Sequence, residues 1–227
     1  MKSNLILTGG INHDFLDTAN AIAEVLAEDN IRSIVTDDLE SGFNQLNKMS
    51  FDLVTVFTLR WRMLDDDKYI PQRTEWAYEI RQRDRQILTE HISRGGGLLG
   101  LHTASICFDT WPEWPELLGA RWVWQQTFHP PPTELYVNVS DEHEVTRNLN
   151  NFFVVDELYH DLGVAPSSFP LLKTLSSHDD SLQSIAFANE KFNGKVVYSA
   201  LGHDRASVTT EGHAKFLQRA ANWCSKG

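Results

Sequence analysis

The stretch GGGLLGLHTAS, residues 95–105, places a histidine at the end of a buried strand. Gly95–Gly97 end a helical pattern, and the apolar run Leu98–Leu101 is typical of a strand inside a sheet. His102 follows this run directly and has only small residues after it. A tight turn of this composition exposes one side chain at its apex, as a nucleophile elbow does. The stretch therefore predicts an α/β fold with His102 at the carboxyl end of a strand.

Upstream of this stretch, short apolar runs alternate with helical patterns. The predicted strands are residues 4–7, 33–36 and 53–57, and the predicted helices are 14–28, a short one capped by Ser41, and 74–94. Strands separated by helices indicate a parallel sheet with right-handed crossovers. The charged stretch 60–73, which contains Asp65–Asp67, is too polar for the core and is expected to be a surface excursion or lid.

The second half of the chain has a different pattern, with many strands and few helices. Residues 134–139, ELYVNV, alternate as a strand with one exposed face does. Further strands are predicted at 152–159, 171–175, 184–188 and 196–201, with a final helix at 210–225. We expect these strands to be antiparallel and to extend the first sheet. The chain is thus expected to form one domain over residues 1–227.

Composition excludes several classes of partner. Twenty Lys and Arg against thirty-one Asp and Glu give a net charge of −11, which disfavours nucleic acid and anionic membranes. Two cysteines cannot form a disulfide framework and suit a reducing compartment. We find neither an apolar run of about 18 residues nor a secretory signal in MKSNLILTGG. These features predict a cytoplasmic location.

Several histidines follow predicted strands. His13, His102 and His203 each come shortly after one, and ligands bind beyond the carboxyl ends of strands in open parallel sheets. His129 and Glu157 can join them from the second half. Imidazole and carboxylate suit a divalent metal, zinc above all, so His102, His129, Glu157 and His203 are candidate ligands with His13 in reserve. Histidines in a polar cleft bind substrate hydroxyls equally well, so a metal-free site remains open.

The tryptophans concentrate in WPEWPELLGARWVW, residues 111–124. An indole offers a flat apolar face on which a sugar ring can stack, and Trp111 and Trp124 are the candidate platform. The alternatives are that these rings anchor the segment to the sheet or form a dimer surface. Trp76 and Trp223 are assigned to the core, and Cys107 to a buried, unreactive thiol. The remaining histidines, such as His91 and His213, are expected on helix surfaces.

Six motifs in order resemble the ThuA-like (trehalose utilisation) family, within the class I glutamine amidotransferase-like superfamily. They are residues 95–105, 111–122, 128–132 (FHPPP), 139–149 (VSDEHEVTRNL), 154–162 (VVDELYHDL) and 194–204 (GKVVYSALGHD). The resemblance implies a flavodoxin-like three-layer α/β sandwich. It places the family's site on His102, His129, the pair Asp156 and Glu157, and the segment 202–204. The superfamily's amidotransferases have cysteine at the elbow apex, so His102 there implies different chemistry from glutamine hydrolysis.

The resemblance implies disaccharide or keto-sugar catabolism, and with the residues above it predicts an enzyme that acts on a disaccharide, keto-sugar or related polyol by hydrolysis, isomerisation or epimerisation. The expected catalytic residues are His102, Glu157 and His203. The expected substrate-binding residues are His13, Trp111, Trp124, His129, Asp156, Tyr159 and Asp204. A homo-oligomer is expected, with a divalent metal as the possible cofactor. The alternative is a non-catalytic module that binds a sugar or signal molecule in the same pocket.

Overall fold

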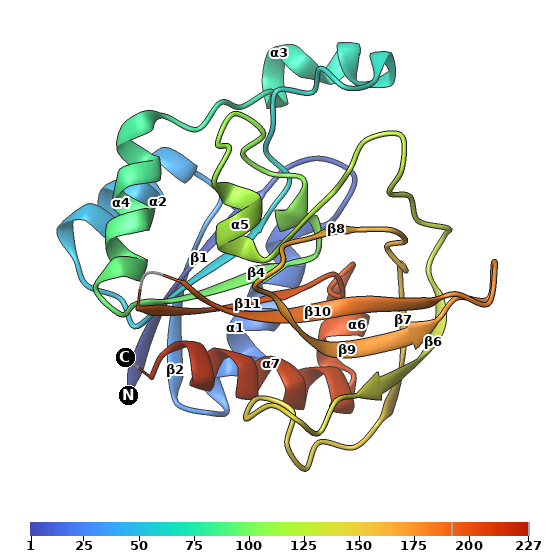
Figure 1. Cartoon of the computed structure of the whole chain (residues 1–227). Helices are drawn as coiled ribbons and strands as arrows, with labels where there is room; N and C mark the ends of the chain where they lie inside the picture. Colours follow the sequence, from blue (N-terminus) through green and yellow to red (C-terminus); the bar gives the residue numbers. More distant parts are fainter. Residues whose placement is uncertain (192, 227) are drawn as a thin grey trace.

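One sheet runs through both halves of the chain in the computed structural model, which describes residues 1–191 and 193–226 (Figure 1). Across the sheet, the strands are β2 (Ile31–Thr36), β1 (Lys2–Gly9), β3 (Leu53–Thr58), β4 (Gly97–Leu101), β11 (Gly194–Ser199), β10 (Leu182–Lys191), β9 (Phe169–Leu175), β6 (Thr133–Val139) and β7 (Phe152–Asp156). Strands β2 to β11 in this order are parallel, and β10, β9, β6 and β7 continue as antiparallel neighbours. The predicted mostly parallel sheet with an antiparallel extension is confirmed.

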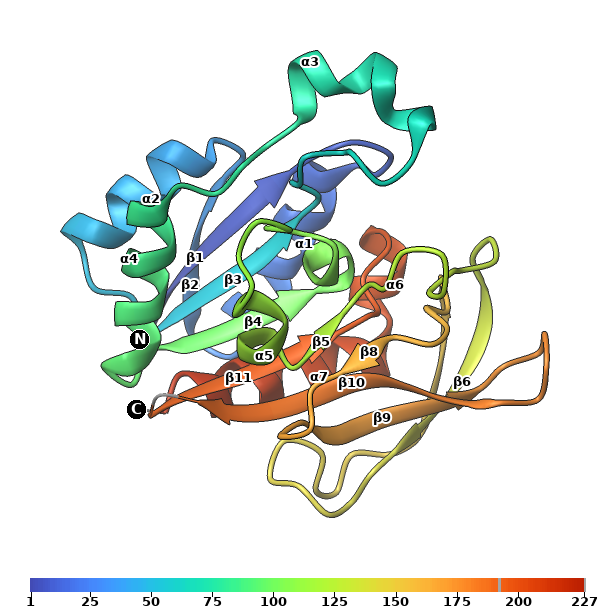
Figure 2. The same cartoon turned by 45° about the horizontal axis from the view of Figure 1, so that its top comes forward.

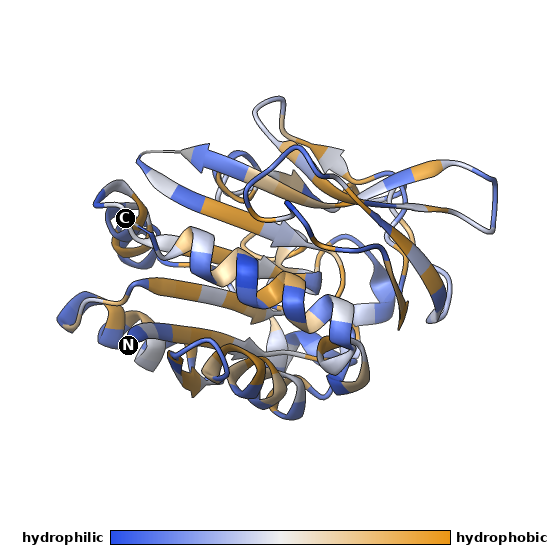
Figure 3. Ribbon diagram, turned by 90° about the horizontal axis from the view of Figure 1, so that it is seen from below, coloured by the Kyte–Doolittle hydropathy of each residue, from blue (hydrophilic) through white to orange (hydrophobic). Residues whose placement is uncertain are grey.

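Helices cover both faces of the parallel part, which makes a three-layer sandwich (Figure 2). Helices α1 (Phe15–Ala27), α6 (Arg205–Thr209) and α7 (Glu211–Cys224) pack together on one face. Helices α2 (Leu39–Lys48), α4 (Gln82–Ser93) and α5 (Trp114–Leu118) lie on the other. The strands between these layers are the most apolar part of the ribbon, whereas the helices mix polar and apolar residues (Figure 3).

The glycines of β4 allow helices to approach this strand closely from both sides. A Cβ atom on Gly97 would overlap the backbone carbonyl of Cys224 at the end of α7. A Cβ atom on Gly100 would overlap the side chain of Leu118 in α5. Because a larger residue would push these layers apart, the glycine-rich stretch determines how tightly the sandwich closes around the strand that ends at His102.

Two helix predictions are wrong in detail. The long helix expected at 74–94 is divided into α3 (Arg73–Trp76) and α4, because the backbone N–H of Tyr78 donates to the carbonyl of Trp61. That bond draws the intervening residues into an extended path. Helix α2 begins earlier than expected, since Asp38 accepts from the backbone N–H of Ser41. Asp38 is therefore the N-cap, and Ser41 lies in the first turn.

Burial corrects other expectations. Trp223 is buried as expected, but Trp76 is only partly buried and lies beside the guanidinium of Arg60, 4.6 Å from its ring centroid. His213 is fully buried rather than on a helix surface. His91 is partly buried, with Nε2 2.9 Å from the carbonyl oxygen of Gly97. Polar partners inside the fold draw these two histidines inward, and the helical pattern does not reveal such partners.

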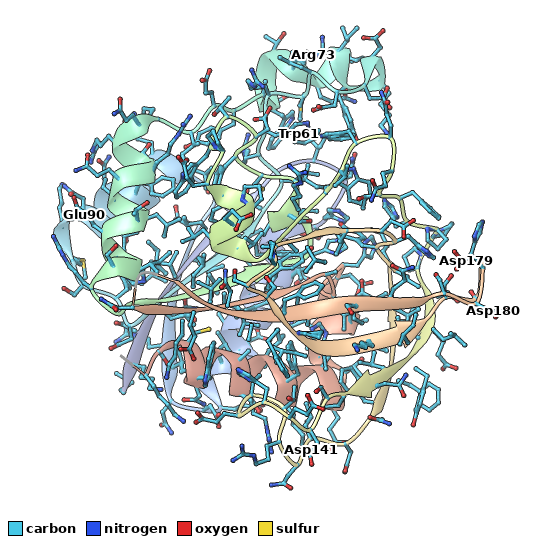
Figure 4. The ribbon with its side chains drawn as sticks, in the orientation of Figure 1. Trp61, Arg73, Glu90, Asp141, Asp179 and Asp180 are labelled. Carbon is cyan, nitrogen blue, oxygen red and sulfur yellow. The ribbon has the colours of Figure 1, made fainter. Side chains whose placement is uncertain are left out.

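The charged stretch 60–73 forms the expected surface excursion only from residue 64 onward, because Trp61 and Met63 near its start are fully buried in the core. It contains the 3₁₀ helix η1 (Asp67–Gln72) and α3, and it stands away from the sheet (Figure 1). Trp61 lies below it near Arg73 (Figure 4). The ring of Tyr69 meets the ring of Trp61 edge-on at 4.9 Å and so ties the excursion to the core.

The connections of the second half include a small sheet that the sequence patterns miss. Strand β5 (Ala120–Arg121) pairs with β8 (Gly163–Val164), and two-residue strands are too short to show any periodicity. Among the residues that the structure describes, no helix is both long and apolar enough to cross a membrane.

Candidate metal centre

His102 occupies the apex of the turn after β4, as predicted. Its φ of 49° is in the left-handed region, which is costly for a residue with a Cβ and recurs at functional turns. The ring is fully buried, and Nδ1 lies 2.7 Å from the carbonyl oxygen of Ala200 after β11. Because a carbonyl can only accept, Nδ1 donates a proton to it, and Nε2 faces the site.

Four side chains from separate connections converge at this end of the sheet. They are His13 after β1, His102 after β4, Glu157 after β7 and His203 after β11. Their ligand atoms all lie within 4.8 Å of one another. We call this set the histidine–glutamate cluster. His13, held in reserve at the level of sequence, is a member, whereas His129 is not.

Glu157 is the centre of charge in the cluster. Oε2 lies 3.4 Å from Nε2 of His102, and Oε1 lies 3.4 Å from Nδ1 of His203 and 3.3 Å from Nδ1 of His129. Burial by itself would raise the pKa of this carboxyl group, but the contacts with His102 and His203 outweigh it and hold the pKa well below its usual range. The same contact raises the pKa of His203. The carboxylate is therefore ionised at neutral pH.

Several polar atoms of the cluster are buried without a hydrogen-bond partner. They include Oε2 of Glu157, Nδ1 of His13 and Nδ1 of His203. Buried polar atoms normally find partners, because leaving one unpaired costs about 1–3 kcal/mol. Burial and the neighbouring rings of His102 and His203 lower the pKa of His13 to about 3, so this imidazole is neutral and offers a lone pair.

This donor set fits a divalent metal. Three imidazoles and one carboxylate are ligands that zinc accepts, and a metal ion would satisfy the orphaned atoms together. The backbone carbonyl of Ala200 already supplies the outer hydrogen bond that orients a metal-binding histidine at His102. The residues that would hold the ion are thus His13, His102, Glu157 and His203.

Asp156 has a supporting place, not a substrate-binding one. It is fully buried, and its Oδ2 accepts from the backbone N–H of Gly202 at 2.8 Å and from the hydroxyl of Ser207. Its Oδ1 accepts from the backbone N–H of Glu157 at 2.7 Å. One carboxylate thus joins the two connections that carry Glu157 and His203. The expected contact with substrate is wrong, because protein donors occupy both oxygens.

Tyr159 and His129 border the cluster. The buried hydroxyl of Tyr159 lies 3.2 Å from Nε2 of His102, and burial raises the pKa of this phenol well above its usual value. Tyr159 is therefore a neutral hydrogen-bond donor at physiological pH. The side chain of His129 is 38% exposed, so this imidazole meets both Glu157 and solvent. A molecule bound at the cluster would therefore lie close to both side chains.

The predicted tryptophan platform is only partly supported. Trp111 is buried against Trp114, with ring centroids 5.5 Å apart, and has no free face for a sugar, so this expectation is wrong. Trp124 is partly exposed but stacks on Trp61 at 6.2 Å. Trp122, which was not a candidate, is nearer the cluster: its ring lies 5.1 Å from that of Tyr159 and 6.0 Å from that of His129. The ring of Trp122 also lies 6.1 Å from that of Trp124, in a segment that is a loop and not a strand, so no periodicity in the sequence indicated its position.

Three further residues lie outside the cluster. Asp204 is exposed and caps α6 by accepting from the backbone N–H of Ser207, which does not bring it into the cluster. Burial raises the pKa of the Cys107 thiol to about 12, so it is no nucleophile at neutral pH. Sequence reasoning missed Ser207, whose hydroxyl lies between Asp156 and Nδ1 of His213. A serine three residues after a capping aspartate was the only signal for it.

Comparison with solved structures places this geometry on a known fold. A ThuA-like protein from Parabacteroides merdae is 16% identical, with all of this chain and 90% of that chain covered and a TM-score of 0.75. A protein from Salmonella typhimurium described as cytoplasmic is 13% identical, with coverage of 97% and 99% and a TM-score of 0.64. A glutamine amidotransferase from Thermotoga maritima is 11% identical over the whole of both chains, with a TM-score of 0.55.

Because all three sequence identities are low, these likenesses are evidence for the fold alone. A search of curated proteins finds no match. The model of the ThuA family, described as trehalose utilisation, matches residues 4–224. The match includes the elbow at His102 and both connections that carry Glu157 and His203, so over nearly its whole length this chain belongs to the ThuA family.

Proposed function

We propose that this protein is a cytoplasmic, metal-dependent enzyme that isomerises or epimerises a keto-sugar or related carbohydrate. The observation that carries the proposal is the histidine–glutamate cluster, in which four ligand atoms lie within 4.8 Å of one another. The carbohydrate class is taken from the family description, trehalose utilisation. The cytoplasmic location is supported by two free, buried cysteines and by neighbours from Salmonella typhimurium described as cytoplasmic.

The arrangement favours proton transfer over hydrolysis by paired carboxylates. Most glycoside hydrolases place two carboxyl groups on either side of the scissile bond. Here Glu157 lies among the histidines, and the oxygens of its neighbour Asp156 are occupied by protein donors. A bound divalent metal supplies Lewis acidity, which polarises a carbonyl or hydroxyl oxygen of the substrate.

The residues around the cluster are suited to handle the proton. His129 reaches solvent and contacts Glu157, so its imidazole can accept a proton from the carbon next to a carbonyl group. Tyr159 can donate a hydrogen bond to a substrate oxygen from beside His102. Trp122, which is partly buried beside both rings, can contact the apolar face of the sugar.

Metal content tests the first part of the proposal. Zinc should copurify with the wild-type protein or bind on titration, as measured by elemental analysis and calorimetry. His102→Ala and Glu157→Gln should each lose the ion, because each removes one of four ligands. The matched control is His178→Ala, an exposed histidine outside the cluster. Equal zinc content in all four proteins, or none in the wild type, refutes the metal centre.

Deuterium exchange tests the chemistry. A keto-disaccharide incubated with the loaded protein in D2O should gain deuterium beside its carbonyl group, detected by NMR. His129→Gln should retain the metal but lose most of the exchange, because its amide cannot accept the proton. Binding of the sugar without exchange, unchanged in His129→Gln, would instead support the non-catalytic binding module. Release of a free monosaccharide would indicate hydrolysis.

A further inference from the structure

A row of large apolar side chains crosses the antiparallel end of the sheet on its outer face. Phe153 in β7 pairs with Tyr136 in β6, and their rings are 4.9 Å apart. The register that pairs Val137 with Thr174 brings Tyr136 beside Leu175 in β9. Leu175 in turn pairs with Leu182 in β10. These four side chains are between 47% and 58% exposed. We call them the cross-strand row.

The opposite face of β6 and β7 is buried inside the protein. Phe152, Val154, Leu135 and Val137 alternate with the exposed residues and are buried, and α7 contacts β7. Helix α5, on the other face of the sheet, packs mainly on β10 and β11. In Figure 3 the strands of this extension reach beyond the helices. The cross-strand row therefore stays exposed because the layer that covers the parallel strands does not extend over it.

The size of the row agrees with one half of a protein–protein interface. Aromatic side chains carry roughly 150–250 Å² each, so the half-exposed Phe153 and Tyr136, together with the smaller leucines of the row and the neighbouring Val155, offer on the order of 400 Å². A stable interface buries about 800 Å² per partner, of which somewhat more than half is apolar. The row supplies that apolar part, and Glu134, Asn138 and Lys173 beside it supply a polar rim of both charges.

We propose that the cross-strand row is the interface of a homodimer, in which the outer faces of β6, β7, β9 and the start of β10 from two copies pack together. A two-fold axis presents the same patch on both subunits, and an apolar surface is complementary to itself. A net charge of −11 disfavours an anionic membrane as the occupant. The tryptophan-rich segment is a weaker candidate, because Trp122 and Trp124 are engaged with rings of their own chain.

Light scattering coupled to gel filtration tests this interface in the full-length protein. The wild type should have twice the mass of one chain. Phe153→Glu and Leu175→Lys, on different strands, should each run at the mass of one chain. Their folds should be intact, since both side chains point to solvent, and far-UV circular dichroism checks this. The matched control is Leu16→Glu, an equally exposed leucine on α1, which should stay dimeric.

The proposal is overturned by a wild type with the mass of one chain, or of three or more. It is also overturned if the wild type is a dimer and both folded variants remain dimeric. Dissociation by Leu16→Glu as well as by the row variants would show that added charge alone separates the subunits, and this too refutes the row as the contact. This test does not depend on zinc content, so its outcome is independent of whether the proposed enzyme function is correct.

Discussion

Replacing Asp156 by asparagine removes the charge that joins the Glu157 and His203 connections and changes almost no volume. The carboxylate accepts from the N–H groups of Glu157 and Gly202 and from the hydroxyl of Ser207. An amide has one acceptor oxygen, so in either orientation its NH2 group faces a backbone N–H. One buried donor left unpaired costs about 1–3 kcal/mol, and the remaining bonds lose the strengthening that the charge provides.

Together these losses amount to about 3 kcal/mol in the free energy of unfolding. For a chain of this length, that corresponds to a Tm lower by roughly 6–12 °C. Urea unfolding followed by tryptophan fluorescence in EDTA measures the change without any contribution from a metal. The control is Asp180→Asn, which makes the same chemical change at the exposed tip of the β9–β10 hairpin (Figure 4).

The stabilities of wild type and Asp156→Asn should differ by far more than those of wild type and the control. A second readout is zinc affinity. It should fall by about 10- to 100-fold, as is typical when a residue that orients a metal ligand is replaced. A variant within about 0.5 kcal/mol of wild type would refute the role assigned to Asp156, because that is the range of neutral surface substitutions.

Three further predictions concern the core. Gly97→Ala should lower the free energy of unfolding by about 1–3 kcal/mol, because its Cβ would overlap the carbonyl of Cys224; a neutral effect in urea unfolding would contradict this. Burial lowers the pKa of His213, so the unfolded chain binds the extra proton as pH falls below about 6.5 and stability should decrease from about pH 7 to about pH 5. His213→Gln should have a shallower dependence in the same titration, and an unchanged slope would count against it. Cys107 should resist a thiol reagent in the native protein and react after denaturation, and rapid native labelling would show that the thiol is accessible.

Local patterns determined most of the fold. Buried strands read as short apolar runs because both their faces meet helices, and ELYVNV alternates because one face of β6 is exposed. The helix at 74–94 could not be placed correctly, since the break depends on a bond from Tyr78 to the distant Trp61. The burial of His213 likewise depends on Ser207 and on the packing of α7.

For the candidate site, the sequence by itself placed His102 at a strand end. It also identified Glu157 and His203 as candidate metal ligands, with His13 in reserve. Only the tertiary structure decided which ligand atoms meet. His13 is part of the cluster, His129 lies at its edge, and the carboxylate of Asp156 accepts hydrogen bonds from backbone N–H groups. It also buried Trp111 and left the cross-strand row exposed. The physical reason is that residue type and spacing report local burial, whereas distances between strand ends depend on the order of strands in the sheet.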